Sequence, residues 1–596
     1  MSLVVLLVAT VIFVLGYRYY ARRMDREVME TDPQRATPAT MYNDGVDFMP
    51  ASASVLFGYQ FKSIAALGPI VGPIVGLQYG WVPALAWIIL GTLLIGWVQD
   101  YSSALLAMRN DGLTMAGLSY KLISPRARTL LLSFLYIYLL LIMGAFGAIA
   151  APLLAGRNVA VGFIAIVLAG VLAGQMTYRW KVDLLVTTVV TVAIALLGTW
   201  IGTLPLFAGE TGLVAAINGL AGNAEGVLFN TPYGPMPWST VFWAVVIALF
   251  CYLGSVLPIW RFAQPVNYTS FWFVALGMVL AILGIAIATF TGSVNTSFQI
   301  PAFVTLYRPN LGPIWPILFV TIACGAISGW HSLVSTSGTA RQLERETDTL
   351  PVGGGAMFTE GILAALALIM GATLIVRPDG TPIYDVALNY QLMPAAGGVF
   401  ADGLARFMNV VGVPLSLGGA IGSIFLVVMA LTVMQLVLRF MRIASAELLG
   451  DSIPAFKNVH FGSAVALALT LFLVLAGYWQ WIWVLFGGSN QLFASLALLL
   501  VTIWLANQGK RYNWTLIPGA FMYVTTIAAL LWTSWNALNK GFINRPADMT
   551  TPFVIGNLIS AAFGLYMAVS AVLLLIDGIR AFNRARSGTL RPAVGD

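Results

Sequence analysis

The sequence predicts an all-α polytopic membrane protein with about fifteen transmembrane helices. Only 53 of the 596 residues are charged, 30 Lys and Arg and 23 Asp and Glu, which is about a third of the share usual in soluble domains. Hydrophobic residues make up 59% of the chain. A soluble globule of this size could not cover its surface with so few charged groups.

Apolar stretches of about 20 residues, long enough to cross a bilayer, recur along the whole chain. They cover residues 2–20, 53–79, 82–107, 129–155, 159–177, 182–206, 239–259, 270–292, 313–336, 354–376, 412–440, 460–484, 489–506, 514–535 and 553–578. We expect the first to be a retained helix, because no basic residue precedes it and arginines follow it. The longest external connections, 207–238 and 377–411, are expected to be lids or vestibule walls.

The basic residues indicate the orientation of the chain. If the N-terminus is outside, 23 Lys and Arg fall in cytoplasmic segments, 6 in external segments, and Lys62 within a span. Cytoplasmic loops of membrane proteins carry such an excess of positive charge. We therefore expect a multi-pass protein of the plasma (inner) membrane with an external N-terminus and a cytoplasmic C-terminus.

The composition disfavours several other functions. Basic residues are scattered one to four per loop, so no nucleic acid partner is expected. Cys251 and Cys324 lie in apolar runs, and His331 and His460 are the only histidines, which leaves no metal or haem motif. No phosphate-binding loop or soluble catalytic domain is evident. We expect no cofactor beyond a coupling ion, and we do not expect an enzyme.

Two spans contain residues that interrupt helices. They are Gly68, Pro69, Gly72 and Pro73 in the first, and Gly254, Ser255 and Pro258 with the adjacent Trp260 in the second. Non-helical backbone at membrane depth is tolerated where it lines a cavity or is buried in protein. Two broken helices five spans apart predict an inverted-repeat transporter that binds substrate at the breaks. A simple proline kink would also account for the second.

Ionisable residues inside the spans are candidates for ion coupling. Lys62, Asp100, His331 and Glu360 are expected at similar depth, towards the cytoplasmic side. A charge at the bilayer centre costs about 2.5–3.5 kcal/mol, so such residues are usually functional. Together they could carry a proton or replace a bound cation. Alternatively, Asp100 and Glu360 reach the membrane surface or neutralise Lys62 and nearby arginines.

Several motifs resemble those of the carbon starvation protein A (CstA) family. They are 43–47 (NDGVD), 55–58 (VLFG), 68–73 (GPIVGP), 98–100 (VQD), 321–326 (TIACGA) with 328–331 (SGWH), and 485–492 (LFGGSNQL). The resemblance covers nearly the whole chain. It implies secondary transport, with import of peptides during nutrient limitation, and with proton-coupled pyruvate import in close relatives.

The resemblance also implies a LeuT-like core of five plus five helices over residues 53–440. The expected repeats are about 53–206 and 239–440, preceded by an N-terminal helix and linker (1–52) and followed by accessory helices and a tail (441–596). In this mapping the eighth core helix is 313–336. The resemblance therefore makes Ser332, Ser335 and Thr336 candidates for a sodium site.

The sequence departs from the family pattern at two places. Where members usually read FGHHFAA, residues 57–63 read FGYQFKS, so a histidine pair is absent and Lys62 is present. Where members usually read TLDTxTR, residues 433–439 read VMQLVLR, so an acidic residue is lost. Both changes leave open whether a proton or sodium is the coupling ion. We hypothesise that Lys62 replaces sodium or cycles protons.

We expect a secondary active transporter that imports small peptides across the plasma membrane by alternating access. Its partners would be a small-molecule substrate and the lipid bilayer. A proton- or sodium-coupled symporter of pyruvate or another small carboxylate is the alternative. A channel, a nutrient sensor and an intramembrane enzyme based on His331 with Asp100 or Glu360 are less expected.

Overall fold

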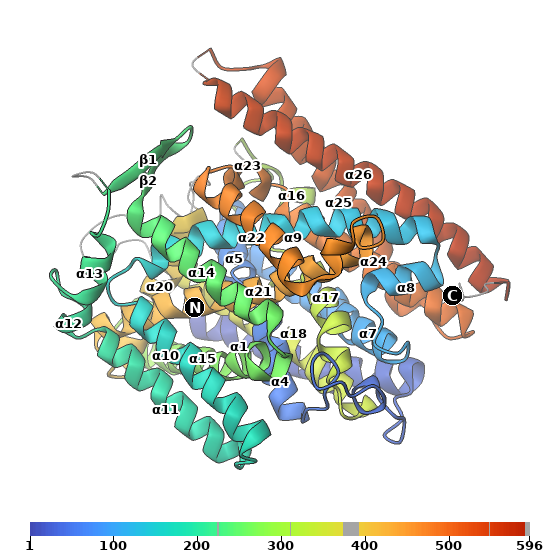
Figure 1. The fold of residues 1–596 in the computed structure, drawn as a ribbon, viewed down its shortest axis with the longest axis horizontal. Helices are drawn as coiled ribbons and strands as arrows, with labels where there is room; N and C mark the ends of the chain where they lie inside the picture. The colour runs from blue at the N-terminus through green and yellow to red at the C-terminus, as the bar shows by residue number, and fades with distance from the viewer. Residues whose placement is uncertain (223–225, 310, 374–392, 548, 590–596) are drawn as a thin grey trace.

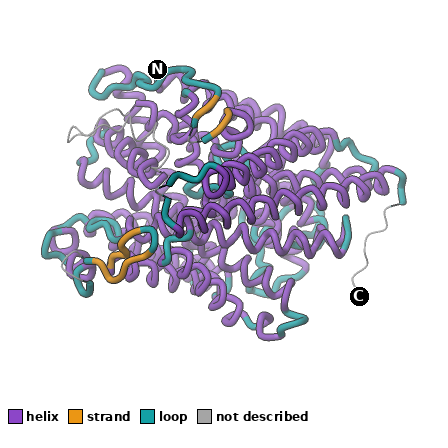
Figure 2. The backbone as a smooth tube through the Cα atoms, turned by 90° about the horizontal axis from the view of Figure 1, so that it is seen from above, coloured by secondary structure: helices purple, strands orange, loops and turns teal. Residues whose placement is uncertain are grey.

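The chain is built almost entirely of helices (Figure 1). The computed structural model describes residues 1–222, 226–309, 311–373, 393–547 and 549–589. In these ranges the strands form two short hairpins, seen in orange in Figure 2. They are β1 (Val227–Thr231) with β2 (Gly234–Pro237), and β3 (Tyr307–Arg308) with β4 (Gly312–Pro313).

Twelve helices in the described residues are long and apolar enough to cross a membrane, and one bent pair adds a thirteenth span. They are α1 (Ser2–Leu15, continued to Met29), α6 with α7 (Trp81–Gly91 and Trp97–Met108), α9 (Pro125–Leu154), α10 (Ala160–Gly174), α11 (Leu184–Gly202), α14 (Trp238–Val256), α15 (Ala263–Thr291), α18 (Gly355–Thr373), α21 (Leu415–Leu449), α24 (Phe486–Asn507), α25 (Asn513–Leu538) and α26 (Thr551–Arg586). The prediction of an all-α polytopic membrane protein is confirmed.

The predicted count of fifteen spans is approximate. Two predicted spans are present as shorter helices: 313–336 contains α16 (Ile314–Thr321) and α17 (Gly329–Ser337), and 460–484 contains α22 (Val459–Leu475) and α23 (Trp479–Trp483). Small helices complete the chain, namely α3 (Pro38–Met41), α8 (Met115–Leu122), α12 (Pro205–Ala208) and α13 (Leu213–Asn218).

Local sequence explains where several long helices begin. Ser124 precedes α9 and accepts a hydrogen bond from the amide of Ala127, while Pro125 occupies the first helical position. Asp183 caps α11 by accepting from the amides of Leu185 and Val186. These side chains satisfy amides that have no partner within the helix.

Two helices are interrupted, and their interruptions are in contact. Residues 65–67 separate α4 (Ala53–Ile64) from α5 (Gly68–Gly76), with a bend of 47°. Residues 322–328 separate α16 from α17. A Cβ atom on Gly68 would lie 2.6 Å from Cys324 Sγ, and one on Gly72 would lie 2.6 Å from the carbonyl oxygen of Thr321. Glycine therefore allows the two breaks to meet.

The prediction of a second broken helix at 239–259 is wrong. Helix α14 is continuous to Val256, and Gly254 and Ser255 lie in its last turn. Leu257 and Pro258 are extended, and a short 3₁₀ turn, Ile259–Arg261, leads into α15. Pro258 lies beyond the last helical residue, where it ends the helix instead of interrupting it. The second broken helix is α16 with α17.

The helices that follow the two broken pairs pack in a reciprocal way. Helices α9 and α21 pack against each other, and both α14 and α22 pack against this pair. Helix α15 lies against α4, and α24 lies against α17. Helix α18 packs on α5, as α7 packs on α17. Such an arrangement is typical of two inverted halves. The repeat boundaries 53–206 and 239–440 remain predictions.

The protein interior lies around α21 and α24, and other helices form the edges. In the most apolar stretch of 18 residues, 94% of the residues are buried in α21 and in α24, compared with 22% in α11. Helices α25 and α26 run along one edge and α11 along another (Figure 1). The core therefore consists of the broken helices and the long helices packed around them.

The two long connections contain structure that was not predicted. In 377–411, residues 377–392 lie outside the described residues, and Met393–Val410 forms helix α20, which packs on α15 and α21. Its apolar side is buried, including Val399, Phe400 and Leu404. In 207–238, α13 is followed by the β1–β2 hairpin, which lies at the edge of the molecule (Figure 1).

Candidate functional site

A cavity of about 110 Å³ reaches the two helix breaks. Gly68 and Gly72 of α5 line it from one side, and Thr321 and Ala323 line it from the other. The rest of the wall comes from Leu311, from the segment around Gly487, and from α25 through Trp532 and Asn536. In the predicted orientation this cavity lies in the outer half of the membrane.

The ends of two helices meet beside this cavity. Helix α5 begins at Gly68, so its N-terminal end, with partial positive charge, faces the break. Helix α16 ends at Thr321, so its C-terminal end, with partial negative charge, lies next to it. The cavity therefore offers one end suited to a carboxylate and one suited to a cation. Pro69 and Pro73, also predicted to bind substrate, are buried in α5 behind the lining glycines.

The other predicted substrate residues lie away from the cavity. The carbonyl of Gly254 accepts from Arg439 Nε at 3.2 Å, and the Ser255 hydroxyl lies 2.9 Å from that of Ser463. Trp260 Nε1 donates to the carbonyl of Gly45 at 3.0 Å. Pro258 lies in the turn between α14 and α15. Residues 259 and 260 contact the segment 43–49 on the predicted cytoplasmic side.

Three of the predicted ion-coupling residues form a line of side chains through the protein interior. Asp100 comes from α7, His331 from α17 and Glu360 from α18, and all three are fully buried. His331 Nδ1 lies 2.9 Å from Asp100 Oδ2, and Nε2 lies 3.2 Å from Glu360 Oε2. The imidazole therefore stands between two carboxylates that are 260 residues apart in sequence, one on α7 and one on α18.

Lys62, the fourth ionisable residue, is also fully buried. Its Nζ donates to Thr432 Oγ1 at 2.7 Å and to the carbonyl of Ala65 at 3.3 Å. Its ammonium also interacts electrostatically with Glu360. Lys62 thus connects the break after α4 with α21 and belongs to one charge cluster with the other three. We refer to Lys62, Asp100, His331 and Glu360 as the ionisable cluster.

The hydroxyl groups proposed as sodium ligands have partners within the protein. The amide of Gln99 donates to Ser332 Oγ and, at 2.8 Å, to the carbonyl of Ser328. Gln60 Nε2 donates to Ser335 Oγ at 3.1 Å. Thr336 Oγ1 donates to the carbonyl of Ser332 at 2.7 Å within its own helix. Ser332 and Ser335 thus hold α17 against α7 and α4, and their role as sodium ligands remains a prediction.

Asn490 supports the second break and was not singled out from the sequence. Its Oδ1 accepts from the hydroxyl of Tyr138 at 2.6 Å, from Ser328 Oγ at 3.1 Å and from the amide of Trp330 at 3.1 Å. Its Nδ2 donates to Cys324 Sγ at 3.3 Å. An asparagine inside a span is itself a signal, and it stands in the 485–492 motif.

A second set of polar residues links the first break to α15 and α21. Trp330 Nε1 donates to the carbonyl of Ser63 at 2.7 Å, and Asn267 Nδ2 donates to Ser63 Oγ at 2.7 Å. Gln435 Nε2 in turn donates to Asn267 Oδ1 at 2.9 Å. Gln435 stands where the family resemblance predicts an acidic residue. In this chain, the hydrogen bond to Asn267 is therefore made by a neutral amide.

On the predicted cytoplasmic side, the segment before α4 is tied to α21. Asp44 Oδ1 accepts from the amides of Val46, Asp47 and Phe48 at 2.8–2.9 Å. Burial opposes ionisation of Asp44, but these amides outweigh it and lower its pKa below the usual value. The resulting turn directs Asp47 to Arg439, with 2.6 Å between Asp47 Oδ1 and Arg439 Nη1.

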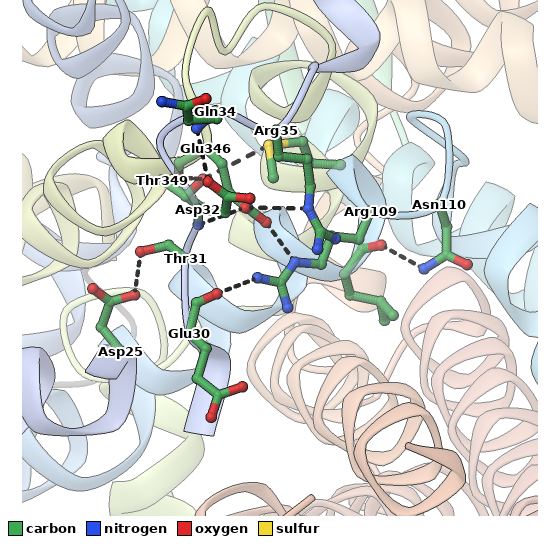
Figure 3. A network of polar contacts seen from close by, with 12 residues as sticks. Asp25, Glu30, Thr31, Asp32, Gln34, Arg35, Arg109, Asn110, Glu346 and Thr349 are labelled. Atoms are coloured by element: carbon green, nitrogen blue, oxygen red, sulfur yellow. Dashed lines mark hydrogen bonds and ion pairs between the residues drawn. The ribbon is translucent and has the colours of Figure 1, made fainter. Parts of the chain in front are cut away.

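Glu346 organises a second network on the same side (Figure 3). This fully buried carboxylate accepts from Arg109 Nε and, at 2.8 Å, from the amide of Asp32, and it lies 3.5 Å from Arg35 Nε. Arg109 also donates to the carbonyl of Glu30 at 3.0 Å. The end of the N-terminal helix is thereby joined to α7 and to the beginning of the span that carries Glu360.

The comparisons with known proteins agree with these motifs. The family model "Carbon starvation protein CstA" matches residues 1–379 and 383–529. "Peptide transporter CstA" of Campylobacter jejuni is 31% identical over 88% of this chain and 79% of its own length. "Pyruvate/proton symporter BtsT" of Escherichia coli is 28% identical over 87% of this chain and 80% of its own length.

Solved structures show weaker similarity. A mutant of the manganese transporter of Eremococcus coleocola aligns over 90% of this chain and 99% of its own, with 14% identity and a TM-score of 0.38. MhsT in complex with L-phenylalanine aligns over 91% of this chain and 99% of its own, also with 14% identity and a TM-score of 0.38. The family model and the first relative cover most of the sequence, and the chain therefore belongs to the carbon starvation protein CstA family.

Proposed function

We propose that this protein imports small peptides across the plasma membrane as an ion-coupled secondary active transporter. The observation that carries this proposal is the cavity at the junction of the two helix breaks, because transporters with inverted halves bind substrate at such breaks. Membership of the CstA family supports it, since relatives bear the name peptide transporter.

The ends of α5 and α16 favour a substrate with two opposite charges. The N-terminus of α5 would hold a carboxylate at Gly68, and the carbonyls at the end of α16 near Thr321 would hold an ammonium group. A peptide presents both groups, whereas pyruvate presents only a carboxylate. Gly68 and Gly72 let the second break approach α5 closely, which brings the two helix ends to the same cavity.

We infer an alternating-access cycle in which this structure is closed on the cytoplasmic side. The cavity is on the predicted outer side, whereas the Asp47–Arg439 ion pair and the Glu346 network join the helices on the opposite side. Opening inwards would require these contacts to separate. The predicted orientation, with the N-terminus outside and the C-terminus in the cytoplasm, is part of this proposal.

Lys62 is proposed to serve as a resident cation at the coupling site. Its ammonium binds both a carbonyl at the end of α4 and a hydroxyl of α21, the kinds of oxygen that would otherwise coordinate sodium. Uptake by Lys62→Ala vesicles under imposed pH or sodium gradients tests this role. An altered dependence on the gradients is expected, and unchanged dependence would contradict it.

Symport of pyruvate with protons is the second candidate function. BtsT, named a pyruvate/proton symporter, is 28% identical to this chain, close to the identity of the peptide transporters. An enzyme is disfavoured because Asp100, His331 and Glu360 are fully buried and none of them lines the cavity that a substrate would enter.

Uptake into proteoliposomes distinguishes the candidates. Labelled dipeptides, tripeptides and pyruvate are offered separately, each with an imposed proton gradient or sodium gradient, and protein-free liposomes serve as the control. We expect saturable accumulation of peptides against their gradient. Accumulation of pyruvate alone would favour the second candidate, flux without accumulation would indicate a channel, and no uptake of any compound would contradict transport.

A further inference from the structure

We propose that the coupling ion is a proton and that Glu360 is the side chain that carries it, with Asp100 and His331 as positioning residues. This inference rests on the proposed transport function. It concerns the division of roles within the ionisable cluster, whose two carboxylates have different surroundings.

The two carboxylates of the cluster are bound unequally. Asp100 Oδ2 has a hydrogen bond with His331 Nδ1 at 2.9 Å. Neither oxygen of Glu360 has a hydrogen-bond partner among the described residues, although Oε2 lies 3.2 Å from His331 Nε2. This distance would allow a hydrogen bond, but the N–H group of His331 does not point at the carboxylate oxygen well enough to form one. Asp100 is therefore held by one hydrogen bond, although its Oδ1 has no partner among the described residues, while Glu360 has only the ion pair with His331.

The cost of charge burial favours Glu360 as the member that exchanges a proton. A buried carboxylate without hydrogen bonds is expensive in its ionised form and gains by binding a proton. Asp100 has less to gain, since its ionised form is stabilised by the hydrogen bond from the imidazole. Asp100 instead fixes the orientation of His331, so that Nε2 faces Glu360.

The charges around Glu360 balance before a proton is added. The acidic and basic side chains buried with it are Lys62 from α4, Asp100 from α7 and His331 from α17, and α4 and α7 also contribute the buried phenols of Tyr59 and Tyr101, which are neutral at physiological pH. Helices α1, α5, α6 and α20 also pack against α18, the helix that carries Glu360. The first three contain no ionisable side chain, and the charged residues of α20, Asp402 and Arg406, are partly exposed. Two cations and two carboxylates make the ionised cluster neutral, so one added proton leaves a net positive charge.

Glu360 lies close enough to the breaks for this added charge to affect substrate. Ala364, one helical turn further along α18, faces Gly325 in the second break: a Cβ on Gly325 would lie 2.7 Å from the Cβ of Ala364. A turn of α-helix rises about 6 Å over four residues. Protonation of Glu360 would therefore attract a substrate carboxylate at the nearby break, and the bound carboxylate would in turn favour the proton.

The proton balance of the cycle follows from this arrangement. A proton from the external side binds Glu360 Oε1 or Oε2 as the substrate binds, and the same proton leaves to the cytoplasm after the substrate has been released. On the external side one O–H bond of hydronium breaks as the O–H bond of Glu360 forms, and on the cytoplasmic side the Glu360 O–H bond breaks as water accepts the proton. The cluster then returns to its neutral, ionised form.

Glu360→Gln, which keeps the shape of the side chain but cannot release a proton, is the central test. Purified wild type and variant are compared in proteoliposomes for proton-driven accumulation and for counterflow, the exchange of labelled for unlabelled substrate without a gradient. The substrate is whichever labelled peptide or pyruvate the wild type accumulates. We expect at least a tenfold loss of accumulation with counterflow retained.

Two further variants separate coupling from stability. Glu447→Gln changes another poorly exposed carboxylate, bound to Arg128 at 3.7 Å, and is expected to behave as wild type. Asp100→Asn is expected to keep coupling but to shift the pH profile of uptake, because it alters the positioning of His331. Infrared difference spectra provide a readout that does not need transport: a protonated carboxyl band should disappear in Glu360→Gln and persist in Glu447→Gln.

The outcomes distinguish this inference from the proposed function. Transport by the wild type together with undiminished accumulation by Glu360→Gln would overturn the role of Glu360 alone. An unchanged carboxyl band in Glu360→Gln would also overturn it. Failure of the wild type in both transport assays would instead overturn the proposed function, and the coupling role with it.

Discussion

Replacing Arg439 by Gln should release the predicted cytoplasmic side of the protein. Arg439 is 2% exposed and is held by three acceptors on two separate segments: Asp47 at 2.6 Å, the carbonyl of Gly254 at 3.2 Å and the carbonyl of Leu257. The shorter, neutral glutamine cannot reach all of them. The segment before α4 would then lose its charged attachment to α21.

The magnitude follows from the burial of this ion pair. Removing one partner of a buried pair costs about 3–5 kcal/mol. The carboxylate of Asp47 is 29% exposed and regains some hydration, so the lower end of this range applies, about 3 kcal/mol. If these contacts exist only in the closed state, the equilibrium between closed and open forms shifts by a factor of about 100.

Labelling of Cys324 provides the assay. The chain has two cysteines, both buried, so Cys251→Ala leaves only Cys324 at the second break. Its reaction with a membrane-impermeant maleimide is measured in inside-out vesicles. We expect labelling at least ten times faster when Arg439→Gln is added. Arg442→Gln removes a contact with the Ser255 carbonyl at 3.1 Å and should change the rate little.

A double-mutant cycle makes the test stringent. Asp47→Asn removes the other side of the same ion pair, so it should reproduce most of the effect, and the double variant should add little to Arg439→Gln. Equal labelling rates in Arg439→Gln and its parent would refute the reasoning. Fully additive effects would show that the two residues act separately.

Three further predictions concern the breaks and the segment before α4. Asn490→Ala leaves three buried donors without their acceptor, and each unpaired donor costs about 1–3 kcal/mol of stability. The melting temperature should therefore fall by several degrees, and it should fall less in Asn490→Asp, which keeps the accepting oxygen. Gly72→Ala forces the breaks apart and should abolish uptake, whereas Gly419→Ala, which meets no atom within 4 Å, should not. Because the pKa of Asp44 is lowered on folding, its contribution is present above the unfolded value of about 3.9 and is lost as the pH falls through the folded value. Asp44→Asn should therefore lower thermal stability at pH 7, and the difference should shrink below about pH 3.9; a constant difference would contradict this explanation.

The spans could be predicted because their signal is local. A run of apolar residues must be buried in lipid or protein wherever it lies, so most predicted spans correspond to long helices. Helix α20 was not predicted, because Asp402 and Arg406 interrupt its apolar pattern and the local signal is lost. Its Val399, Phe400 and Leu404 are buried by α15 and α21, which sequence does not reveal.

The helix breaks show why local sequence signals do not predict the features that depend on tertiary packing. Pro258 is a strong helix breaker, but it lies just past the last turn of α14. The true second break, 322–328, contains no proline and is opened by packing against α5 and by the hydrogen bonds of Asn490. The ionisable residues could be found one by one, whereas the pairing of Asp47 with Arg439, 392 residues apart, depends on the tertiary structure.

The attachment of the N-terminal helix constrains the order in which the protein is assembled. The amide of Asp32 binds Glu346, 314 residues later, and Glu30 binds Lys510, 480 residues later. This helix can meet Arg109 early in synthesis, but it acquires Glu346 and Lys510 only after many of the later spans have been made. Until then its arginines and acids have to stay hydrated at the membrane surface. A chain truncated before Glu346 should consequently lack the buried carboxylate that holds the end of this helix, and increased proteolysis near Asp32 would report the loss.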